Sequence, residues 1–413
     1  MPPTTQEKSR QQFLDRVAKF EEANPDIKIE PSEAQWDAKT FAARLAGGQL
    51  ETVFIVPLTE PQGMIKRRQI ADITDELKAL PHAADFDERA LSPATDSAGR
   101  HYGLPTSEFA LSLVYNRELF TKAGLDPDNP PKTWDDVRVA AKAIFEKTGI
   151  PGYAQPTTTN GGGWLLTAMT YTRGGRMEKE QDGKWVPAFN DAPTLQTLQW
   201  LKEMRWTDNA MGAQMVRASA DVLKDFSAGK VGMHIATPST YGDHITKYNG
   251  NPEMFGVTAL PSGGTNATLI GGKMAVVSPK ASHAERAAAV KWIDYYYLQP
   301  KYDVAIAESR AQTQAADKLP VGIPAVPFYG PAVDGPVTEA VNKHANVPVK
   351  NFAPFLTGSQ QQEFVPEPTV AAQDVYAALD TVMQAVLTRQ NADPAAELAK
   401  AEDRVKPLLE RAQ

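Results

Sequence analysis

Three aromatic residues lie in polar stretches of the sequence, where a flat ring could stack on a sugar. Trp36 follows a strand-and-turn pattern, Trp164 follows three glycines in "NGGGW", and Tyr241 lies in "TPSTYGD". The apolar face of a pyranose stacks on such rings while nearby amides, carboxylates and hydroxyls bind its hydroxyl groups. Ordinary packing beneath a loop is the competing interpretation for each ring. The three residues are therefore candidate ligand contacts.

A carboxylate placed just after a strand is a second kind of candidate. Glu60 follows the apolar run "TVFIV" at its carboxyl end, and the carboxyl ends of strands in α/β sheets commonly bind ligands. A surface carboxylate that caps the next helix explains Glu60 equally well. A glycosidase would need two carboxylates about 5–10 Å apart. Sequence spacing cannot reveal such a pair, so an enzyme acting on carbohydrates stays an alternative.

Sequence motifs for catalysis and for metal or nucleotide binding are missing. "IGGK" is followed by Met274, where a phosphate-binding loop needs Ser or Thr, and no G-x-S-x-G or G-x-G-x-x-G pattern follows a strand. None of the six histidines forms H-E-x-x-H. His234 and His244 lie near Asp243, but an incidental arrangement is simpler than a metal site. We expect no cofactor and no metal.

Composition narrows the class further. The 413 residues are 42% hydrophobic and 23% charged, carry a net charge of -7 and include no cysteine. Disulfides and thiolate chemistry are therefore excluded, and nucleic acid is an unfavourable partner for an acidic chain. No stretch approaches the roughly 18 apolar residues of a membrane-spanning helix. The first residues lack the basic and apolar regions of an export signal, which indicates a cytoplasmic protein unless a signal has been removed.

Helix and strand patterns alternate along the chain, which predicts an α/β fold. A helix over 6–23, a strand "IKIE" and a helix over 36–46 precede "TVFIV", whose apolar character is typical of a parallel sheet. "ALSLV" is another predicted strand, and Asn116 and Gly124 are suited to cap the following helix. Residues 318–368 are rich in Pro and Gly and predict an irregular segment that wraps a surface or lines a site. Further helices are expected over 192–206, 219–228, 283–298, 368–389 and 394–411, with capping boxes at Thr133–Asp136 and Ser282–Glu285.

Four blocks in order resemble the bacterial extracellular solute-binding proteins of carbohydrate ABC importers, the family of maltose-binding protein. They begin with "GGQLETVFIVPLTEPQGMIKRRQIADITDEL" and "AGRHYGLPTSEFALSLVYNRELFTKAGLDPDNPPKTWDDVRVAAKAI". "DFSAGKVGMHIATPSTYGD" and "LIGGKMAVVSPKASHAERAAAVKWIDYYY" follow. The resemblance covers nearly the whole chain. One departure is the start, because the family usually begins with a strand and an aromatic-bearing loop before the first helix.

The resemblance implies two α/β lobes of the type II periplasmic-binding-protein fold, with a ligand cleft between them and hinge crossovers joining them. Residues 1–107 and 272–318 would form the first lobe, and 108–271 and 319–413 the second. Glu108 and Phe109 would then lie at the hinge. Paired glycines around Gly272 would permit close approach of the backbone to a ligand.

The implied function is that of a sugar receptor and not of an enzyme. The protein would be a monomer outside the cytoplasm, lipid-anchored in its natural form, and would deliver its ligand to ABC permease subunits. A receptor for a non-sugar solute is the remaining alternative. The expected ligand contacts are Trp36, Glu60, Glu108, Phe109, Trp164, Tyr241 and Gly272.

Overall fold

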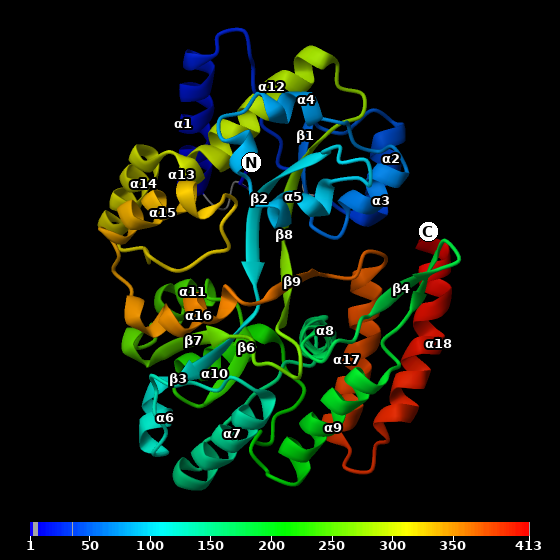
Figure 1. The fold of residues 1–413 in the computed structure, drawn as a ribbon, viewed down its shortest axis with the longest axis vertical. Coiled ribbons are helices and arrows are strands. Elements are labelled where there is room, and N and C mark those ends of the chain that lie inside the picture. Colours follow the sequence, from blue (N-terminus) through cyan, green and yellow to red (C-terminus); the bar gives the residue numbers. More distant parts are fainter. Residues whose placement is uncertain (3–6, 35, 413) are drawn as a thin grey trace. The chain divides into compact units, whose positions relative to one another are not determined.

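The computed structural model describes residues 1–2, 7–34 and 36–412, and these fall into two compact units. Figure 1 labels their helices and strands. Unit 1 comprises residues 1–108, 271–311 and 327–343, and unit 2 comprises residues 109–270, 312–326 and 344–413. Two of the boundaries lie one residue from those expected from the resemblance. Residues 327–343, expected in the second lobe, instead group with unit 1, and residues 312–318 group with unit 2.

Unit 1 is built around a sheet in which β1 pairs with β8 and β8 with β2. Its strands are β1 (Val53–Pro57), part of β2 (Gly103–Ala110) and part of β8 (Ala267–Val277). Its helices are α1 (Glu7–Ala23), α2 (Ala38–Ala46), α3 (Pro61–Lys66), α4 (Thr74–Lys78), α5 (Glu88–Leu91), α12 (His283–Ile293), α13 (Gln299–Tyr302), most of α14 (Val304–Ala316) and α15 (Pro331–Asn342). A π-helical turn over Asp294–Leu298 continues α12.

Unit 2 holds the sheet β6-β3-β7, the hairpin β4-β5, and β9, which pairs with β8. Its strands are β3 (Ser112–Asn116), β4 (Glu178–Gln181), β5 (Lys184–Pro187), β6 (Met233–Ala236), β7 (Phe255–Ala259) and β9 (Glu363–Pro366). Its helices are α6 (Arg117–Lys122), α7 (Trp134–Thr148), α8 (Gly161–Tyr171), α9 (Ala192–Trp206), α10 (Ser219–Ser227), α11 (Thr240–Thr246), α16 (Ala353–Ser359), α17 (Ala372–Thr388) and α18 (Pro394–Ala412).

Strand direction is where the sequence interpretation fails. β1 was expected in a parallel sheet, but it pairs antiparallel with β8, and β3 pairs antiparallel with both β6 and β7. β3 is nevertheless buried at all five positions. A wholly apolar run indicates that a strand is covered on both faces, and it carries no information about the direction of its neighbours.

The residues predicted to cap the ends of helices do so in the structure. The Asn116 side chain accepts a 3.0 Å hydrogen bond from the amide of Leu119 at the start of α6, and Gly124 adopts a φ of 77° just after that helix. The capping boxes at the starts of α7 and α12 both form. These signals depend only on neighbouring residues, so the sequence contains all the information they need.

Two expectations about longer segments are wrong. "IKIE", residues 27–30, belongs to no strand in the described structure. The segment 318–368, expected to be irregular, contains α15, α16 and β9. Pro331 and Pro354 stand in the first turns of α15 and α16, where a missing amide costs nothing. The prolines therefore start these helices.

Candidate functional site

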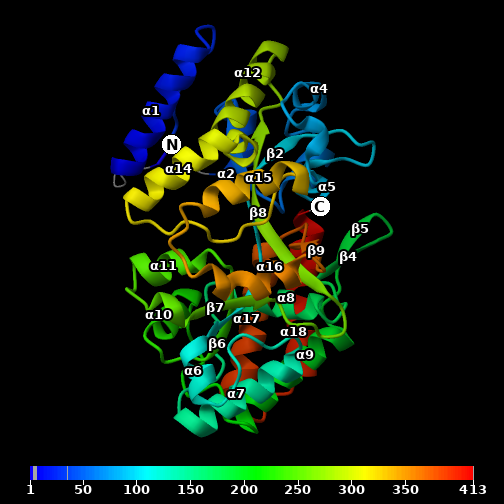
Figure 2. The same cartoon turned by 60° about the vertical axis from the view of Figure 1, so that its left-hand side comes forward.

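Helix α8 carries Trp164, and two of its three glycines, Gly162 and Gly163, lie close against α17 (Figure 1 and Figure 2). A Cβ atom on Gly163 would lie 2.2 Å from the carbonyl oxygen of Tyr376, and one on Gly162 would lie 2.8 Å from the Asp380 carboxylate. No side chain fits at either distance, so the close approach of the two helices requires glycine at positions 162 and 163. The three glycines had indicated a loop, and helix α8 was not expected from the sequence.

Asp380 of α17 caps the amino end of α8. Its carboxylate oxygens accept 2.8 Å hydrogen bonds from the amides of Asn160 and Gly163. Burial raises the pKa of Asp380, and the backbone hydrogen bonds oppose that rise. A carboxylate at this end of a helix satisfies amides that have no partner within the helix and interacts favourably with the helix dipole. The indole of Trp164, one residue after Gly163, is held by this arrangement.

Trp164 lies beside a second ring and a carboxyl group within unit 2. The ring of Phe109 meets the indole edge-on, with centroids 6.1 Å apart and an interplanar angle of 82°. The hydroxyl of Tyr376 donates a 3.2 Å hydrogen bond to Glu367. Burial raises the pKa of Glu367, while Tyr376 and the Trp164 indole lower it in part. Both rings are half-buried, so part of each surface is open to solvent.

Glu178 adds a second buried carboxyl group. It is 7% exposed, and its Oε2 atom accepts a 3.1 Å hydrogen bond from the amide of Val370. Its Oε1 atom has no hydrogen-bond partner in the described part of the chain. Burial raises the pKa of Glu178 to about 7. Burial raises the pKa of Tyr376, and the nearby charges of Glu367 and Glu178 add to the rise, so the three groups lie close together. We call Phe109, Trp164, Glu178, Glu367 and Tyr376 the unit 2 cluster.

Two members of this cluster, Phe109 and Trp164, were predicted from the sequence, and the other three were not. Glu367 stands in "VPEP" inside the segment read as irregular, where a carboxylate just after a strand was the available signal. Glu178 and Tyr376 gave no local signal, because their meeting depends on the packing of β4 and α17.

Tyr241 lies apart from the cluster, in the core of unit 2. It is 2% exposed, and its ring packs edge-on against Phe255 and Phe352, at centroid distances of 5.2 and 5.5 Å. A ring enclosed in this way is not available to stack on a ligand in this arrangement. Its assignment as a ligand contact therefore stays a prediction that the packing disfavours.

Glu108 is the most unusual carboxyl group of unit 1. It is 9% exposed on β2, and neither of its oxygens has a hydrogen-bond partner among the described residues. Burial raises its pKa to about 8, Asp87 adds to the rise, and Arg89 and Lys301 oppose it. The group is therefore mostly protonated at neutral pH. A neutral carboxyl both donates and accepts hydrogen bonds, as a sugar hydroxyl requires.

Glu60 and Gly272 lie at the end of β1 that follows Pro57. Glu60 stands at the start of α3 but makes no capping hydrogen bond, and burial raises its pKa. Gly272 accepts a 3.1 Å hydrogen bond from the amide of Leu58. A Cβ atom on Gly272 would lie 2.1 Å from the carbonyl oxygen of Ser107, so approach of β2 to β8 alone requires glycine here. The Glu60 carboxyl accepts a 3.5 Å hydrogen bond from the Thr59 hydroxyl. The close approach of β2 to β8 is by itself enough to explain why residue 272 is glycine.

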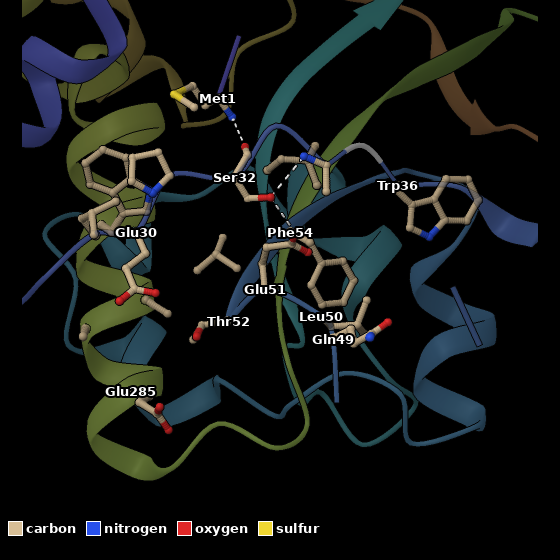
Figure 3. Close-up of a pocket in the computed structure, with 18 of the residues that line it drawn as sticks. Met1, Glu30, Ser32, Trp36, Gln49, Leu50, Glu51, Thr52, Phe54 and Glu285 are labelled. Carbon is tan, nitrogen blue, oxygen red and sulfur yellow. Dashed lines mark hydrogen bonds between the residues drawn. The ribbon is translucent and has the colours of Figure 1, made fainter. Parts of the chain in front are cut away.

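Trp36 belongs to a different place in unit 1. It is half-buried, its indole nitrogen is buried without a hydrogen-bond partner in the described structure, and it lines a cavity of about 840 Å³ (Figure 3). Glu60, Glu108 and Gly272 are not among the residues that line this cavity. The structure therefore separates Trp36 from the other candidates of unit 1.

The described part of the chain holds neither a metal-binding cluster nor a membrane-spanning helix. Within residues 1–2, 7–34 and 36–412, no group of three or more His, Cys, Asp or Glu side chains could hold a metal ion. His244 has its two ring nitrogens within 2.9 Å of Ser227 Oγ and the Asn251 carbonyl oxygen. In that same part of the chain, every helix is too short or too polar to span a bilayer.

Comparison with protein families gives a match to the model described as bacterial extracellular solute-binding protein, over residues 3–301. A probable amino-acid ABC transporter periplasmic-binding protein of Sinorhizobium fredii is 28% identical over 54% of this chain and 51% of its own length. An arabinooligosaccharide-binding protein of Bacillus subtilis is 25% identical over 67% of this chain and 64% of its own. The chain thus matches about half to two thirds of the length of these curated relatives.

Solved structures agree with the chain over almost its full length. The cyclic α-maltosyl-1,6-maltose binding protein of Arthrobacter globiformis has a TM-score of 0.71 at 22% identity, covering 97% of this chain and 96% of that one. UgpB of Mycobacterium tuberculosis, solved with glycerophosphocholine, has a TM-score of 0.72 at 15% identity, covering 98% and 96%. At these identities the likeness establishes the fold.

Proposed function

The chain belongs to the bacterial extracellular solute-binding proteins, with the type II periplasmic-binding-protein fold, and we propose that it captures a sugar for an ABC importer. The observation that carries the proposal is the unit 2 cluster. There the half-buried rings of Trp164 and Phe109 stand beside two carboxyl groups with raised pKa values.

A sugar needs both parts of such a cluster. The exposed part of an aromatic ring receives the apolar face of a pyranose, and polar groups around the ring hold the hydroxyls. Glu178 is partly protonated near pH 7, and Glu367 has a raised pKa. These carboxyl groups can therefore accept or donate as each hydroxyl demands. In unit 1, Glu108 and Glu60 offer the same chemistry and are proposed as additional ligand contacts.

Isothermal titration calorimetry with monosaccharides and short oligosaccharides tests the proposal. A thermal-shift screen run in parallel detects weak ligands, since saturation at a hundredfold excess over Kd adds about 2.7 kcal/mol to the free energy of unfolding. We expect one sugar class to bind saturably and to be recovered unchanged. Recovery of a hydrolysed sugar would instead identify an enzyme. Binding of amino acids or glycerol phosphate alone would show that the ligand is a non-sugar solute.

Two substitutions locate the site. Trp164→Ala removes the stacking ring, and Glu367→Gln removes the ionisable group while keeping its shape. Each should weaken binding about tenfold or more, because a contact worth 1.4 kcal/mol or more is lost. Glu363→Gln, at an exposed carboxylate four residues before Glu367, is the matched control and should leave Kd unchanged. Unchanged affinity in Trp164→Ala would place the sugar elsewhere.

We propose the remaining properties from family membership. The protein acts outside the cytoplasm as a monomer, is anchored by a lipid in its natural form, and passes its ligand to the permease subunits of its transporter. Mass measurement in solution tests the monomer, and fractionation of the native cells tests the location and the anchor.

A further inference from the structure

Arg16 stands on the apolar face of α1 in unit 1. Val17 and Phe20 of this face are buried and Phe13 is half-buried. Arg16 follows Phe13 by three residues and precedes Phe20 by four, which is the spacing of neighbours on one helix face. Its guanidinium carbon lies 5.0 Å from the centre of the Tyr296 ring. Arg16 therefore faces the π-helical turn that continues α12.

Arg310 stands on the inward face of α14, a helix that lies beside α1 in both views (Figure 1 and Figure 2). It follows the buried Ala307 by three residues and is itself half-buried. Burial lowers the pKa of Arg310 to about 10, the charge of Arg16 lowers it further, and the phenol groups of Tyr296 and Tyr295 oppose the fall. The two guanidinium groups and the two phenols therefore lie close together. We call Arg16 and Arg310 the arginine pair.

The arginine pair lacks an anionic partner. Among the residues that the structure describes, neither guanidinium makes a hydrogen bond or an ion pair, and no carboxylate contributes to the pKa shift of Arg310. The nearby carboxylates are directed elsewhere. Asp15 is exposed and accepts a 2.8 Å hydrogen bond from Gln11, and Asp294 accepts one of 2.9 Å from the Tyr302 hydroxyl.

Other half-buried cations of unit 1 have acidic groups beside them. Arg286 lies 3.2 Å from Glu76. Burial lowers the pKa of Lys301, a neighbour of Arg310, and the charge of Asp334 opposes that fall. The chain carries 50 acidic residues against 43 basic ones, so acidic side chains are not scarce. Two like charges that are partly removed from water without a counter-charge are unfavourable, and a bound anion would relieve both costs.

The donors at this place suit an oxyanion. Each guanidinium presents a planar fork of N–H groups that matches two oxygens of a phosphate. The hydroxyls of Tyr295 and Tyr296 have no hydrogen-bond partner in the described part of the chain, so they offer two further donors. We propose that the arginine pair binds a phosphate group, either as the inorganic ion or as part of a lipid headgroup. This site shares no residue with the proposed sugar contacts.

The test measures phosphate binding by the 413-residue protein in two arms. Calorimetry with inorganic phosphate, at an ionic strength held constant with sodium chloride because salt screens exposed charges, should show saturable binding at one site. Sedimentation with phosphatidylglycerol vesicles, against phosphatidylcholine vesicles that carry no net charge, is the second arm. Binding of inorganic phosphate would identify the free ion as a ligand, and binding to the anionic vesicles alone would identify the headgroup.

Substitutions tie the binding to the arginine pair. Arg16→Gln and Arg310→Gln should each raise the Kd for phosphate about tenfold or more, because a charge-assisted contact is lost. Arg310→Lys keeps the charge without the fork and should have a smaller effect. Lys19→Gln removes the same charge from an exposed position on α1 and is the matched control, in which Kd should stay unchanged.

A purely structural role for Arg310 predicts the opposite behaviour without phosphate. In phosphate-free buffer, Arg310→Gln should unfold at the same or a higher temperature, because repulsion from Arg16 disappears. A lower unfolding temperature there would show that Arg310 serves the packing on the tyrosines, and it would overturn the proposal. Absence of binding in both arms, or unchanged binding in both glutamine variants, would overturn it as well. None of these outcomes bears on sugar binding, which is measured with other ligands and at other residues.

Discussion

The carboxylate of Asp380 accepts a 2.8 Å hydrogen bond from the amide of Gly163, and this bond joins two helices that are 217 residues apart in sequence. The same carboxylate holds the amide of Asn160. The amino end of α8 is therefore closed by a side chain from α17. Trp164 follows Gly163 directly, so the orientation of the candidate stacking ring depends on this cap.

Replacing Asp380 by alanine should cost stability and ligand affinity together. Removal of a helix cap costs about 1–2 kcal/mol, and the freed amides of α8 are buried beneath α17. Urea denaturation measures the loss of stability, and calorimetry measures the loss of sugar affinity. Asp374→Ala changes an exposed carboxylate on the same helix and should cost about 0.5 kcal/mol or less. An equal loss of stability in the two variants would argue against a stabilising cap by Asp380.

Gly163→Ala tests the close approach of α8 and α17. The added methyl would meet the backbone of Tyr376 at 2.2 to 2.7 Å, so the helices must separate, at a cost of about 1–3 kcal/mol or more. Gly242→Ala is the matched control in α11, where a Cβ atom meets nothing within 4 Å. It should stabilise the protein by up to about 1 kcal/mol. Urea denaturation should show a lower free energy of unfolding for Gly163→Ala and a higher one for Gly242→Ala.

The pH dependence of stability should depend on Glu108. Its pKa rises from 4.5 to about 8 on folding because the group is buried. Between these values the unfolded chain releases a proton that the folded protein keeps. The contribution to stability is therefore complete below about pH 4.5 and is lost as the pH rises toward 8.

Glu108→Gln removes this dependence, because glutamine stays neutral. The stability of the variant relative to the original protein should rise from pH 5 to pH 8, by an amount on the order of a few kcal/mol. Glu22→Gln, at an exposed position on α1, serves as the control and should show almost no change. A flat difference for Glu108→Gln across this range would contradict a buried, unpaired carboxyl.

Tyr241 should matter for folding more than for binding. Tyr241→Phe keeps the ring inside its aromatic core and should change both stability and Kd little. Tyr241→Ala leaves a large cavity and should cost about 3–5 kcal/mol. Thermal unfolding and calorimetry on the same samples separate the two effects. A fall in sugar affinity in Tyr241→Phe would restore the ligand role that the sequence suggested.

Sequence alone captured the features that are decided locally. The caps at Asn116, Thr133 and Ser282 were predictable because each is completed within three residues. The start of α8 was not, because three consecutive glycines favour a loop by propensity and become helical only through packing on α17. Glu178 and Glu367 were hidden for the same reason. Their burial and their effect on Tyr376 come from segments that meet only in the folded chain.

The cap on α8 also constrains when this part of unit 2 can be completed. A chain made from its amino end presents residues 160–163 long before residue 380 exists, and the loop that joins them spans more than half of the sequence. Closing so long a loop is an entropic cost that must be met before the contact rewards it. During synthesis, the helix that carries Trp164 therefore keeps an uncapped amino end until residue 380 has left the ribosome.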